Sequence, residues 1–382
     1  MANAEGTVQR RSENNEIKTN RKKMKKGVCS YQSSWADLPQ ELLDMISNDL
    51  NIADYLRFGR VCRSWRTFIS EHKLKFMSSQ SPLVIYMSTR YDENSCYFFD
   101  IITGMRYKTN LPKDNWDFKS CLGVSSGYLI MYFMKRVHRL EGHFCLINPV
   151  TGHQLQFPST PFPLYIINYY ISNICRAIFA SIGSQDQDYL IVILSRKLDY
   201  LQFFISRDNR WRNHSYYVKN NNRVLDIAVF DGRLFVLTED SQIGMFNLRS
   251  CNLRFLELKF APRFDWYRSR LVASDDQLLI VYNFEVYRID FSKMEWVKVN
   301  NLGEKALFIG YGDKCCKLIN PTVWGGRSNC IYILDDEKIC EVYSLNGGFL
   351  GILPLMGKKF CPGTCSWYFI SQSNSIDNIK DD

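Results

Sequence analysis

The sequence predicts a mainly β protein with a small α-helical motif near its N-terminus. Three observations support this prediction. After a polar connector that ends near Pro82, short strands rich in Val, Ile, Tyr and Phe alternate with turn residues. Only residues 37–69 carry apolar side chains at helical spacing. Hydrophobic residues make up 46% and aromatic residues 14% of the 382-residue chain, which is enough to fill a large core.

Residues 1–34 are expected to form a disordered basic tail, and residues 371–382 a second disordered tail. The first tail holds eight Lys or Arg and three Glu, which accounts for more than half of the net charge of +9. The run Arg21–Lys26 fits a nuclear-import signal, and a solvated tail without such a role is the equal alternative. Because the rest of the chain carries little excess charge, we expect no nucleic-acid partner.

Residues 35–76 are expected to form the helical motif. Leucine and isoleucine recur every three or four residues from Leu38 to Leu50, which predicts one apolar face on a first helix. Asp37 is expected to cap this helix, with Gln40 completing a capping box. Further apolar residues up to Ile69 predict one or two more short helices. Helices this short cannot enclose a stable core alone, so another domain or protein should cover part of their surface.

The helical segment resembles an F-box. Leu-Pro-x-Glu-Leu-Leu at 38–43 precedes Leu-Arg-Phe-x-x-Val-Cys-Arg-x-Trp-Arg at 56–66, in the order and spacing of that motif. The resemblance implies docking on a Skp-type adaptor and, through it, on a cullin scaffold. The adaptor-binding residues that it implies are Leu38, Pro39, Leu42, Leu43, Ile46, Leu50, Leu56, Phe58, Val61, Cys62 and Trp65. The alternative is an ordinary helical bundle whose apolar face packs on its own protein.

Residues 77–370 are predicted to form a β-propeller. Six hairpins combine an aromatic-rich strand, a polar turn and a further strand, and their turns lie at Asp100, Asn148, Ser206, Asn247, Asp290 and Leu345. These turns are 41 to 58 residues apart. Other hairpins alternate with them, with turns just before Tyr128, Tyr189, Leu234, Leu278 and Cys330. A repeat of roughly 40–50 residues built from two hairpins is typical of a propeller blade. Six blades are expected, with seven as the alternative; a β-sandwich requires no such repeat.

Segments across residues 80–350 resemble the plant F-box-associated KIB-type β-propeller. They include Leu122–Leu129, Leu146–Gly152, Val286–Asp290 and Leu302–Gly310, and they keep their order. The stretch Arg196–Lys219 resembles the family least, which leaves the bounds of the third blade open. The resemblance implies a plant F-box subunit whose propeller holds a target protein of unknown identity.

No catalytic, cofactor-binding or metal-binding residues are predicted. Gly123–Gly127 fits the G-x-S-x-G pattern of a nucleophile elbow, but a strand-like segment follows it where the elbow requires a helix. We therefore expect a hairpin turn. His138, His143, Cys145 and His153 are donor types that suit zinc, but their spacing matches no familiar zinc motif. They are expected to be ordinary surface or core residues.

Target binding is expected at the loops around the propeller channel. Arg263, Phe264, Trp266, Tyr267 and Arg268 combine residue types that are enriched at interface hot spots, so they form the candidate target-binding loop. The competing interpretation is that these aromatic side chains pack between blades.

The cysteines and the absence of long apolar runs bear on location. The 13 cysteines are odd in number and scattered, in a chain with neither an export signal nor a membrane-spanning run. A reduced protein of the nucleus or the cytoplasm, without a membrane partner, is expected.

These observations together predict the substrate-receptor subunit of a Skp–cullin–F-box ubiquitin ligase. Such a subunit performs no bond chemistry, because it acts by holding its target near a ubiquitin-charged partner. Two alternatives remain open. One is a stoichiometric inhibitor that blocks its target without ubiquitin transfer, and the other is a propeller hydrolase with converging acids or a metal at the channel mouth.

Overall fold

The computed structural model describes residues 35–59, 61–88, 95–111, 118–134, 142–150, 152–160, 175–182, 188–195, 200–215, 223–248, 250–262, 269–274, 276–310, 315–334, 339–354 and 363–369. The predicted tails and the candidate target-binding loop at 263–268 lie outside these residues.

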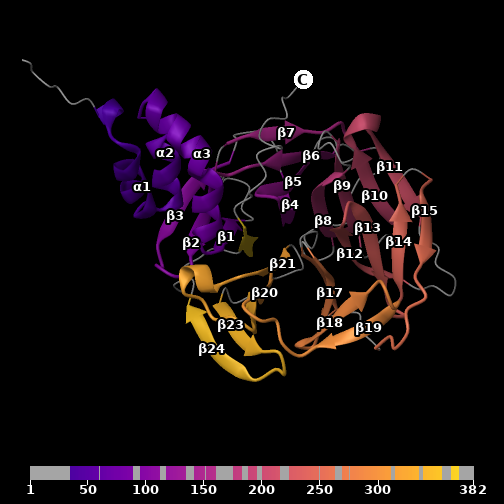
Figure 1. The fold of residues 1–382 in the computed structure, drawn as a ribbon. Coiled ribbons are helices and arrows are strands. Elements are labelled where there is room, and N and C mark those ends of the chain that lie inside the picture. The colour runs from indigo at the N-terminus through magenta and orange to yellow at the C-terminus, as the bar shows by residue number, and fades with distance from the viewer. Residues whose placement is uncertain are drawn as a thin grey trace, which may run out of the picture.

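The N-terminal helical motif consists of a 3₁₀ turn and three α-helices (Figure 1). These are η1 (Trp35–Asp37), α1 (Gln40–Asn48), α2 (Ile52–Phe58) and α3 (Arg63–Ser79). The predicted cap by Asp37 is wrong, because Asp37 belongs to η1 and α1 begins only after Pro39, which makes no side-chain cap hydrogen bond. Proline disfavours helical backbone at the residue before it, so the helix cannot extend back to Asp37.

The next two helices have side-chain caps. Asn51 caps α2, and its Oδ1 accepts a hydrogen bond from the backbone N–H of Asp54 at 3.0 Å. Cys62 caps α3, and its Sγ accepts from the backbone N–H of Trp65 at 3.4 Å. These local bonds fix where the chain turns between helices.

Six sheets form the propeller, and their strands follow here from the channel outwards. Blade 1 is β25 (Gly363–Tyr368), β1 (Leu83–Ser88), β2 (Ser95–Asp100) and β3 (Arg106–Asn110). Blade 2 is β4 (Phe118–Ser125), β5 (Tyr128–Met134), β6 (Gly142–Ile147) and β7 (Gln154–Gln156). Blade 3 is β8 (Cys175–Ile182), β9 (Asp188–Ser195), β10 (Tyr200–Ile205) and β11 (Arg210–Ser215).

The other three blades complete the ring, so the described residues form six blades, as expected (Figure 1). Blade 4 is β12 (Val224–Phe230), β13 (Arg233–Thr238), β14 (Ile243–Asn247) and β15 (Asn252–Phe255). Blade 5 is β16 (Arg270–Ala273), β17 (Leu278–Tyr282), β18 (Glu285–Asp290) and β19 (Glu295–Val299). Blade 6 is β21 (Cys316–Ile319), β20 (Ala306–Ile309), β22 (Cys330–Leu334), β23 (Ile339–Ser344) and β24 (Phe349–Pro354), with a 3₁₀ turn, η6 (Thr322–Trp324), before β22.

All six turns predicted from the repeat join the two outermost strands of a blade. Several of them have a common local cause, a side-chain oxygen that accepts from the backbone just after it. The Asp100 carboxylate accepts from the N–H of Ile102 at 2.8 Å, and Asn148 accepts from Val150 at 3.0 Å. Such turns form from the residues themselves, which is why the sequence reveals them.

Blade 6 departs from the predicted pattern. The prediction of a simple hairpin before Cys330 is wrong, because β22 pairs in parallel with β20, while β21 pairs with the other edge of β20. The chain therefore passes through η6 and returns to the same sheet, which gives this blade five strands.

The ring closes through the C-terminal strand β25, which pairs with β1 over Leu83–Ser88. Two buried residues of β25 also reach the neighbouring blades. Trp367 donates its Nε1–H to the carbonyl of Ile309 in blade 6 at 3.0 Å, and Tyr368 donates its hydroxyl to the carbonyl of Gly127 at 2.9 Å, beside blade 2.

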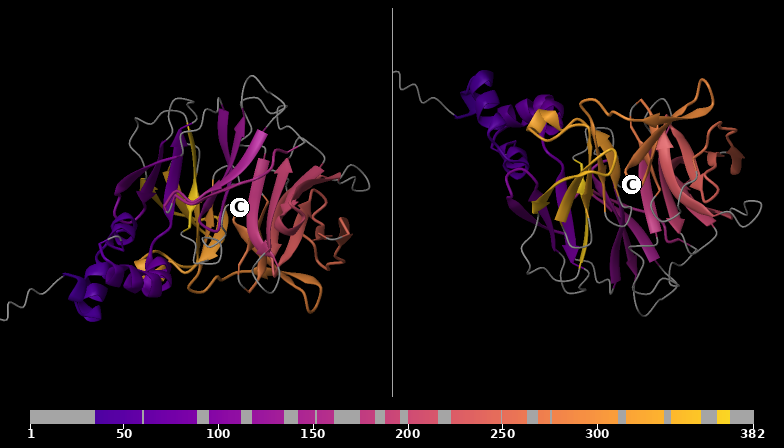
Figure 2. Two further views of the ribbon diagram at one scale, coloured as in Figure 1. Left: turned by 90° about the horizontal axis from the view of Figure 1, so that it is seen from above. Right: turned by 90° about the horizontal axis from the view of Figure 1, so that it is seen from below.

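Apolar side chains fill the spaces between neighbouring blades, and one core continues from blade 1 into the helices. Phe76 and Met77 of α3 are buried in the same cluster as Leu83 and Tyr368 of blade 1. Just after α3, Ser81 donates its hydroxyl to the Asp100 carboxylate at 3.1 Å. The helices thus stand beside blade 1 and project beyond one end of the propeller (Figures 1 and 2).

Candidate functional site

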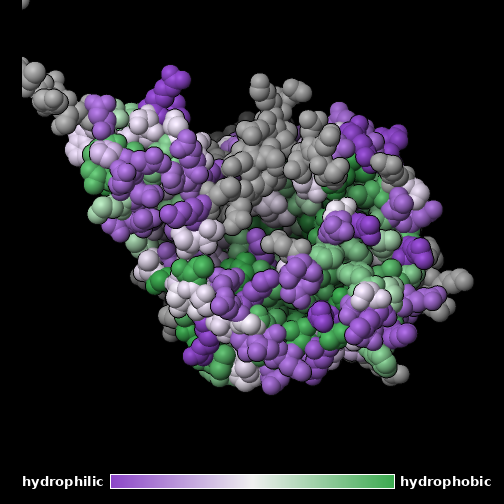
Figure 3. Space-filling model, viewed as in Figure 1, coloured by the Kyte–Doolittle hydropathy of each residue, from purple (hydrophilic) through white to green (hydrophobic). Residues whose placement is uncertain are grey.

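The helical motif presents an apolar stripe to solvent, defined by Leu42, Met45 and Ile46 of α1. Their side chains are 42%, 66% and 37% exposed, and they lie on one face because they are spaced three and four residues apart. Trp35 before α1 and Val61 before α3 are also exposed, at 71% and 56%. Green, apolar side chains lie at the outer edge of this motif in Figure 3. Large apolar side chains left in water on adjacent turns are typical of a protein-binding surface.

The other residues predicted to bind the adaptor differ in how far they are buried. Leu43, Phe58 and Trp65 are buried between the helices, and the rings of Phe58 and Trp65 lie 4.1 Å apart between centroids. Leu38, Leu50 and Cys62 are half-buried, and Pro39 is exposed. The backbone of Leu56 lies in α2, while its side chain lies outside the described residues.

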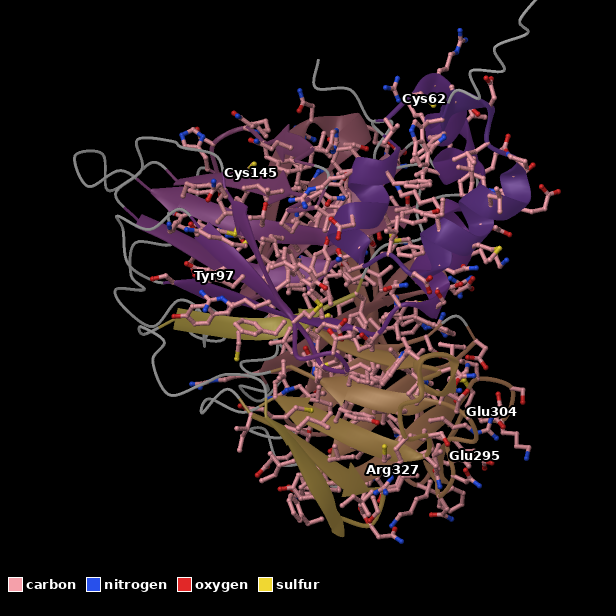
Figure 4. All side chains as sticks on the ribbon, turned by 90° about the vertical axis from the view of Figure 1, so that its left-hand side faces the viewer. Cys62, Tyr97, Cys145, Glu295, Glu304 and Arg327 are labelled. Carbon is pink, nitrogen blue, oxygen red and sulfur yellow. The ribbon has the colours of Figure 1, made fainter. Side chains whose placement is uncertain are left out.

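The spacing predicted a single apolar face on α1, but the structure divides these apolar residues between two faces. Leu42 and Leu43 are consecutive, and consecutive side chains on a helix point about 100° apart. Leu43 packs inward and Leu42 points outward. Trp65 also has a structural role, because its indole Nε1–H donates to the carbonyl of Trp35 at 2.9 Å and holds η1 against α3. Figure 4 shows Cys62 at the end of the helical motif that lies farthest from the propeller.

Two members of the exposed surface, Trp35 and Met45, were not predicted from the sequence. Met45 could have been found, because it stands three residues after Leu42 and beside Ile46. Trp35 precedes the helical pattern, so no periodicity identifies it.

A second candidate surface is the mouth of the propeller channel, a cavity of about 790 Å³ at the end where the helices project. The turns between the inner and second strands of several blades line it, together with the linker from Met77 to Pro82. Lys305, Lys317 and Trp324 also lie on its wall. The hollow near the centre of this face is visible in Figure 3. A concave surface that combines polar and apolar groups can hold a segment of another protein.

A buried ion pair between Arg176 of β8 and Asp226 of β12 joins the channel walls of blades 3 and 4. The Asp226 carboxylate also accepts from the backbone N–H of Leu271 in blade 5 at 2.7 Å and of Ile227 at 2.9 Å. Burial acts to lower the pKa of Arg176, but the Asp226 charge outweighs it and the pKa is raised. Because every oxygen of Asp226 has a partner, this pair has a structural role and is not a free acid or base.

The thiols near the channel are poor nucleophiles. Burial raises the pKa of Cys315 to about 12, and burial also raises the pKa of Cys316. The thiolate is the reactive form of cysteine, so these side chains stay protonated and unreactive near neutral pH. Every cysteine whose side chain the structure describes is free of disulfide bonds.

The motifs that suggested chemistry have structural explanations. Ser125, the central residue of the G-x-S-x-G pattern, ends β4 in the expected hairpin and donates its hydroxyl to the carbonyl of Phe179 at 2.6 Å. His153 bonds to the Tyr128 hydroxyl at 2.8 Å, and His143 lies beside Ser159. His138 lies outside the described residues.

The described part of the chain shows neither a candidate metal site nor a candidate membrane span. No group of three or more His, Cys, Asp or Glu side chains there could hold a metal ion. Within the same residues, no helix has the length and apolar character needed to cross a membrane.

Comparison with known proteins identifies both parts of the chain. Residues 35–77 match the model of the F-box domain, and residues 98–344, more than half of the chain, match the model described as the KIB1-4 beta-propeller. These matches fall on the helical motif and on most of the blades.

Relatives that match along most of their own length include proteins of Arabidopsis thaliana. The F-box/kelch-repeat protein At1g57790 is 23% identical, over 82% of this chain and 88% of its own length. The F-box protein At2g26160 is 25% identical over 80% of this chain and 96% of its own length, and the F-box protein At2g17036 is 23% identical over 86% and 93%. The solved structure of TolB from Acinetobacter baumannii also matches, at 10% identity over 80% of this chain and 73% of that one, but its TM-score of 0.43 supports no argument.

The domain pair and the relatives support an F-box substrate-receptor role. The chain belongs to the KIB1-4 β-propeller family and carries an F-box domain ahead of its propeller, which is the domain arrangement of a plant F-box protein.

Proposed function

We propose that this chain is the substrate-receptor subunit of a Skp–cullin–F-box ubiquitin ligase. The observation that carries the proposal is the exposed stripe of Leu42, Met45 and Ile46 on the helices that match an F-box domain. F-box domains in general bind Skp-type adaptors, so this surface is the proposed adaptor-binding site, and the cullin is reached through the adaptor.

The energetics support a specific interface at this stripe. Burying one large apolar side chain contributes roughly 1.5–3 kcal/mol. With Trp35 and Val61, five exposed apolar side chains are available. Because these side chains are already partly covered, their combined burial is worth less than about 15 kcal/mol. It offsets the lower part of the roughly 4–15 kcal/mol that association costs in lost freedom, provided that most of them are covered together.

The propeller has the complementary role of holding a target protein at the channel mouth. The helices project at the same end as this mouth, so an adaptor and a target would share one side of the molecule. The receptor would then act by raising the concentration of target lysines near a ubiquitin-charged partner. No side chain of the receptor needs to take part in bond chemistry.

Co-purification of the full chain with a Skp-type adaptor tests the docking site. Leu42→Asp and Ile46→Asp each place a charge in the stripe, and each is expected to weaken adaptor binding at least tenfold. The matched control is Ile352→Asp on β24, because Ile352 is 50% exposed but lies on the outer strand of blade 6. The proposal fails if the stripe variants bind the adaptor as tightly as the control.

The same preparation separates a ligase receptor from a blocking inhibitor. If the chain is a ligase receptor, proteins that co-purify with the propeller are expected to carry ubiquitin added by the assembled ligase, and they should accumulate when the proteasome is inhibited. A stoichiometric inhibitor would bind the same proteins, but their abundance would not change under proteasome inhibition.

A further inference from the structure

A second pocket lies between blades 3 and 4, at the same end of the propeller as the channel mouth and the helices. Its volume is about 540 Å³, and its walls come from the ends of β8 and β9 and from the turns after β10, β12 and β14. We name it the blade 3–4 pocket and define it by Ile182, Asp188, Arg207, Arg233, Phe246 and Arg254. A volume of a few hundred Å³ is typical of a site for a small group or a side chain.

Three arginines line this pocket, and the fold places each by a different local feature. Arg207 lies in a 3₁₀ turn, η3 (Ser206–Asp208), between β10 and β11. Arg233 begins β13 directly after the tight turn at Asp231 and Gly232. Arg254 lies on the outermost strand β15 and faces Met245 across the sheet. The three side chains are far apart in sequence but converge on one cavity.

The charges in the pocket do not balance. Among the residues that the structure describes, Asp188 is the only acid on its wall, and its carboxylate forms an ion pair with Arg207 at 3.7 Å. Its other oxygen accepts a hydrogen bond from the Ser206 hydroxyl at 3.1 Å. Arg233 and Arg254 are exposed, and neither has an ion pair among the residues that the structure describes. Within the described part of the chain, two guanidinium groups beside the cavity are therefore left without a counter-charge.

The deeper wall of the pocket is apolar. Ile182 and Phe246 are 7% and 2% exposed and belong to the core between blades 3 and 4. A rigid apolar wall with cations at its edge accepts a group that is anionic at one end and apolar beside it. The rigidity matters because the blades on both sides are fixed by their ladders of hydrogen bonds.

We propose that the blade 3–4 pocket binds a phosphorylated side chain in an extended segment of the target protein. This inference rests on the proposed receptor function and specifies the form of target that the receptor accepts. A phosphomonoester carries roughly −1.5 to −2 charges at neutral pH, which matches the two uncompensated arginines, whereas a carboxylate carries only one. The planar guanidinium also pairs with two phosphate oxygens at once. Phosphorylation of the target would then control its recognition.

The test uses the full chain co-purified with a Skp-type adaptor and three immobilised pools of degenerate peptides. The pools are identical except for one fixed position, which is phosphothreonine, threonine or glutamate, followed by leucine. The phosphothreonine pool is expected to retain at least tenfold more protein than the other two, and inorganic phosphate should compete. The variant Arg233→Ala with Arg254→Ala is expected to lose at least tenfold of this retention. The control is Arg288→Ala, an exposed arginine on β18 that lies outside the pocket.

Each remaining outcome overturns the inference. Equal retention of the phosphothreonine and threonine pools, including no retention of either, excludes phosphate recognition. Retention of the glutamate pool at the level of the phosphothreonine pool assigns the pocket to acidic segments instead. If the double variant binds like Arg288→Ala, phosphate is bound elsewhere. Adaptor binding is measured on the same samples, so loss of the adaptor with intact phosphopeptide binding would refute the proposed function and leave this pocket assigned.

Discussion

At the scale of single residues, the ion pair between Arg176 and Asp226 is expected to be important for stability. Both side chains are buried, and Asp226 also accepts from two backbone N–H groups, so removal of its charge leaves Arg176 without a counter-ion in the channel wall. Breaking such a buried pair typically costs about 3–5 kcal/mol. We expect Asp226→Asn to lower the free energy of unfolding by about this amount, measured by urea denaturation.

A surface pair gives the control for this prediction. Asp276 and Lys305 form an ion pair at 3.3 Å, with side chains that are 62% and 41% exposed. Because solvent screens exposed pairs, Asp276→Asn is expected to cost no more than about 1 kcal/mol. Equal losses for Asp226→Asn and Asp276→Asn would show that the buried pair has no special role.

Buried thiols predict a loss of stability at alkaline pH. Burial raises the pKa of Cys96 to about 12, and burial likewise raises that of Cys315 to about 12, whereas an exposed thiol ionises near about 8.5. Between about pH 9 and pH 12 the native protein therefore holds protons that the unfolded chain has lost. The stabilisation that the protonated buried thiols contribute is complete below this range. The free energy of unfolding must therefore fall as the pH rises through it.

Urea unfolding at pH 8 and pH 10 tests whether the free energy of unfolding falls as the pH rises. The midpoint is expected to be lower at pH 10, and Cys96→Ala should reduce the pH slope by up to about one proton, because one group that ionises on unfolding has been removed. A slope that Cys96→Ala leaves unchanged would contradict the prediction. The alanine variant is also expected to be less stable at both pH values, because it leaves a small cavity.

Sequence reasoning succeeded at this scale where the cause is local. The turns at Asp100 and Asn148 were predicted because each side chain bonds to the backbone two residues later, and that preference belongs to the residue itself. The roles of Leu42 and Leu43 could not be separated, because both fit the spacing of three and four residues. Which one points inward depends on α3 and η1, and apolar spacing does not encode their positions.

At the scale of elements, β25 is the strand that closes the ring. Trp367 is fully buried, and its indole N–H is bonded to the carbonyl of Ile309 in blade 6. Replacing a buried aromatic residue by alanine typically costs about 3–5 kcal/mol, so Trp367→Ala is expected to lower the free energy of unfolding by this amount. Tyr368→Phe removes the hydroxyl that donates to the carbonyl of Gly127 while keeping the ring, and it is expected to cost about 1 kcal/mol.

Thermal unfolding of the two variants and of a chain that lacks residues 363–382 measures this role. The shortened chain leaves β1 as an unpaired edge in the channel, and it is expected to be the least stable of the three. If the shortened chain unfolds at the temperature of the full chain, the ring does not depend on β25 for closure.

Strand pairings between distant parts of the chain could not be predicted from the sequence. The repeat identified six blades because every blade contains the outer local hairpin, and blades 2 to 5 also contain a local hairpin between their two inner strands. The parallel pairing of β20 with β22 joins strands separated in the sequence by β21 and η6. The pairing of β25 with β1 joins the last and the first strands of the propeller sequence. Neither pairing has a turn that a sequence pattern could reveal. For the same reason, Arg207, Arg233 and Arg254 were not connected before their pocket was seen.

For the whole molecule, the relation of the helices to the propeller is fixed by a shared core. Phe76 and Met77 at the end of α3 are buried with residues of blade 1, and Tyr55 of α2 stacks on Phe76 with ring centroids 3.6 Å apart. The helices therefore do not hang from a flexible linker. A receptor that acts by proximity needs a fixed arrangement of helices and propeller, because the distance between adaptor and target sets the effective concentration of target lysines at the ubiquitin donor.

The shared core predicts a single unfolding transition for the helices and the propeller. A helical motif this small is not expected to be stable alone. Insertion of a ten-residue Gly-Ser linker between Ser79 and Leu83 should therefore split the calorimetric transition, with the helices melting first and a bound Skp-type adaptor raising that first transition. The same insertion in the exposed turn between β18 and β19 is the control and should leave one transition. Because the linker lets the target drift from the ubiquitin donor, it should also slow ubiquitin transfer while leaving adaptor affinity unchanged. A single transition in both insertion variants would contradict this prediction, because the helices and the propeller would then unfold together without the direct connection between Ser79 and Leu83.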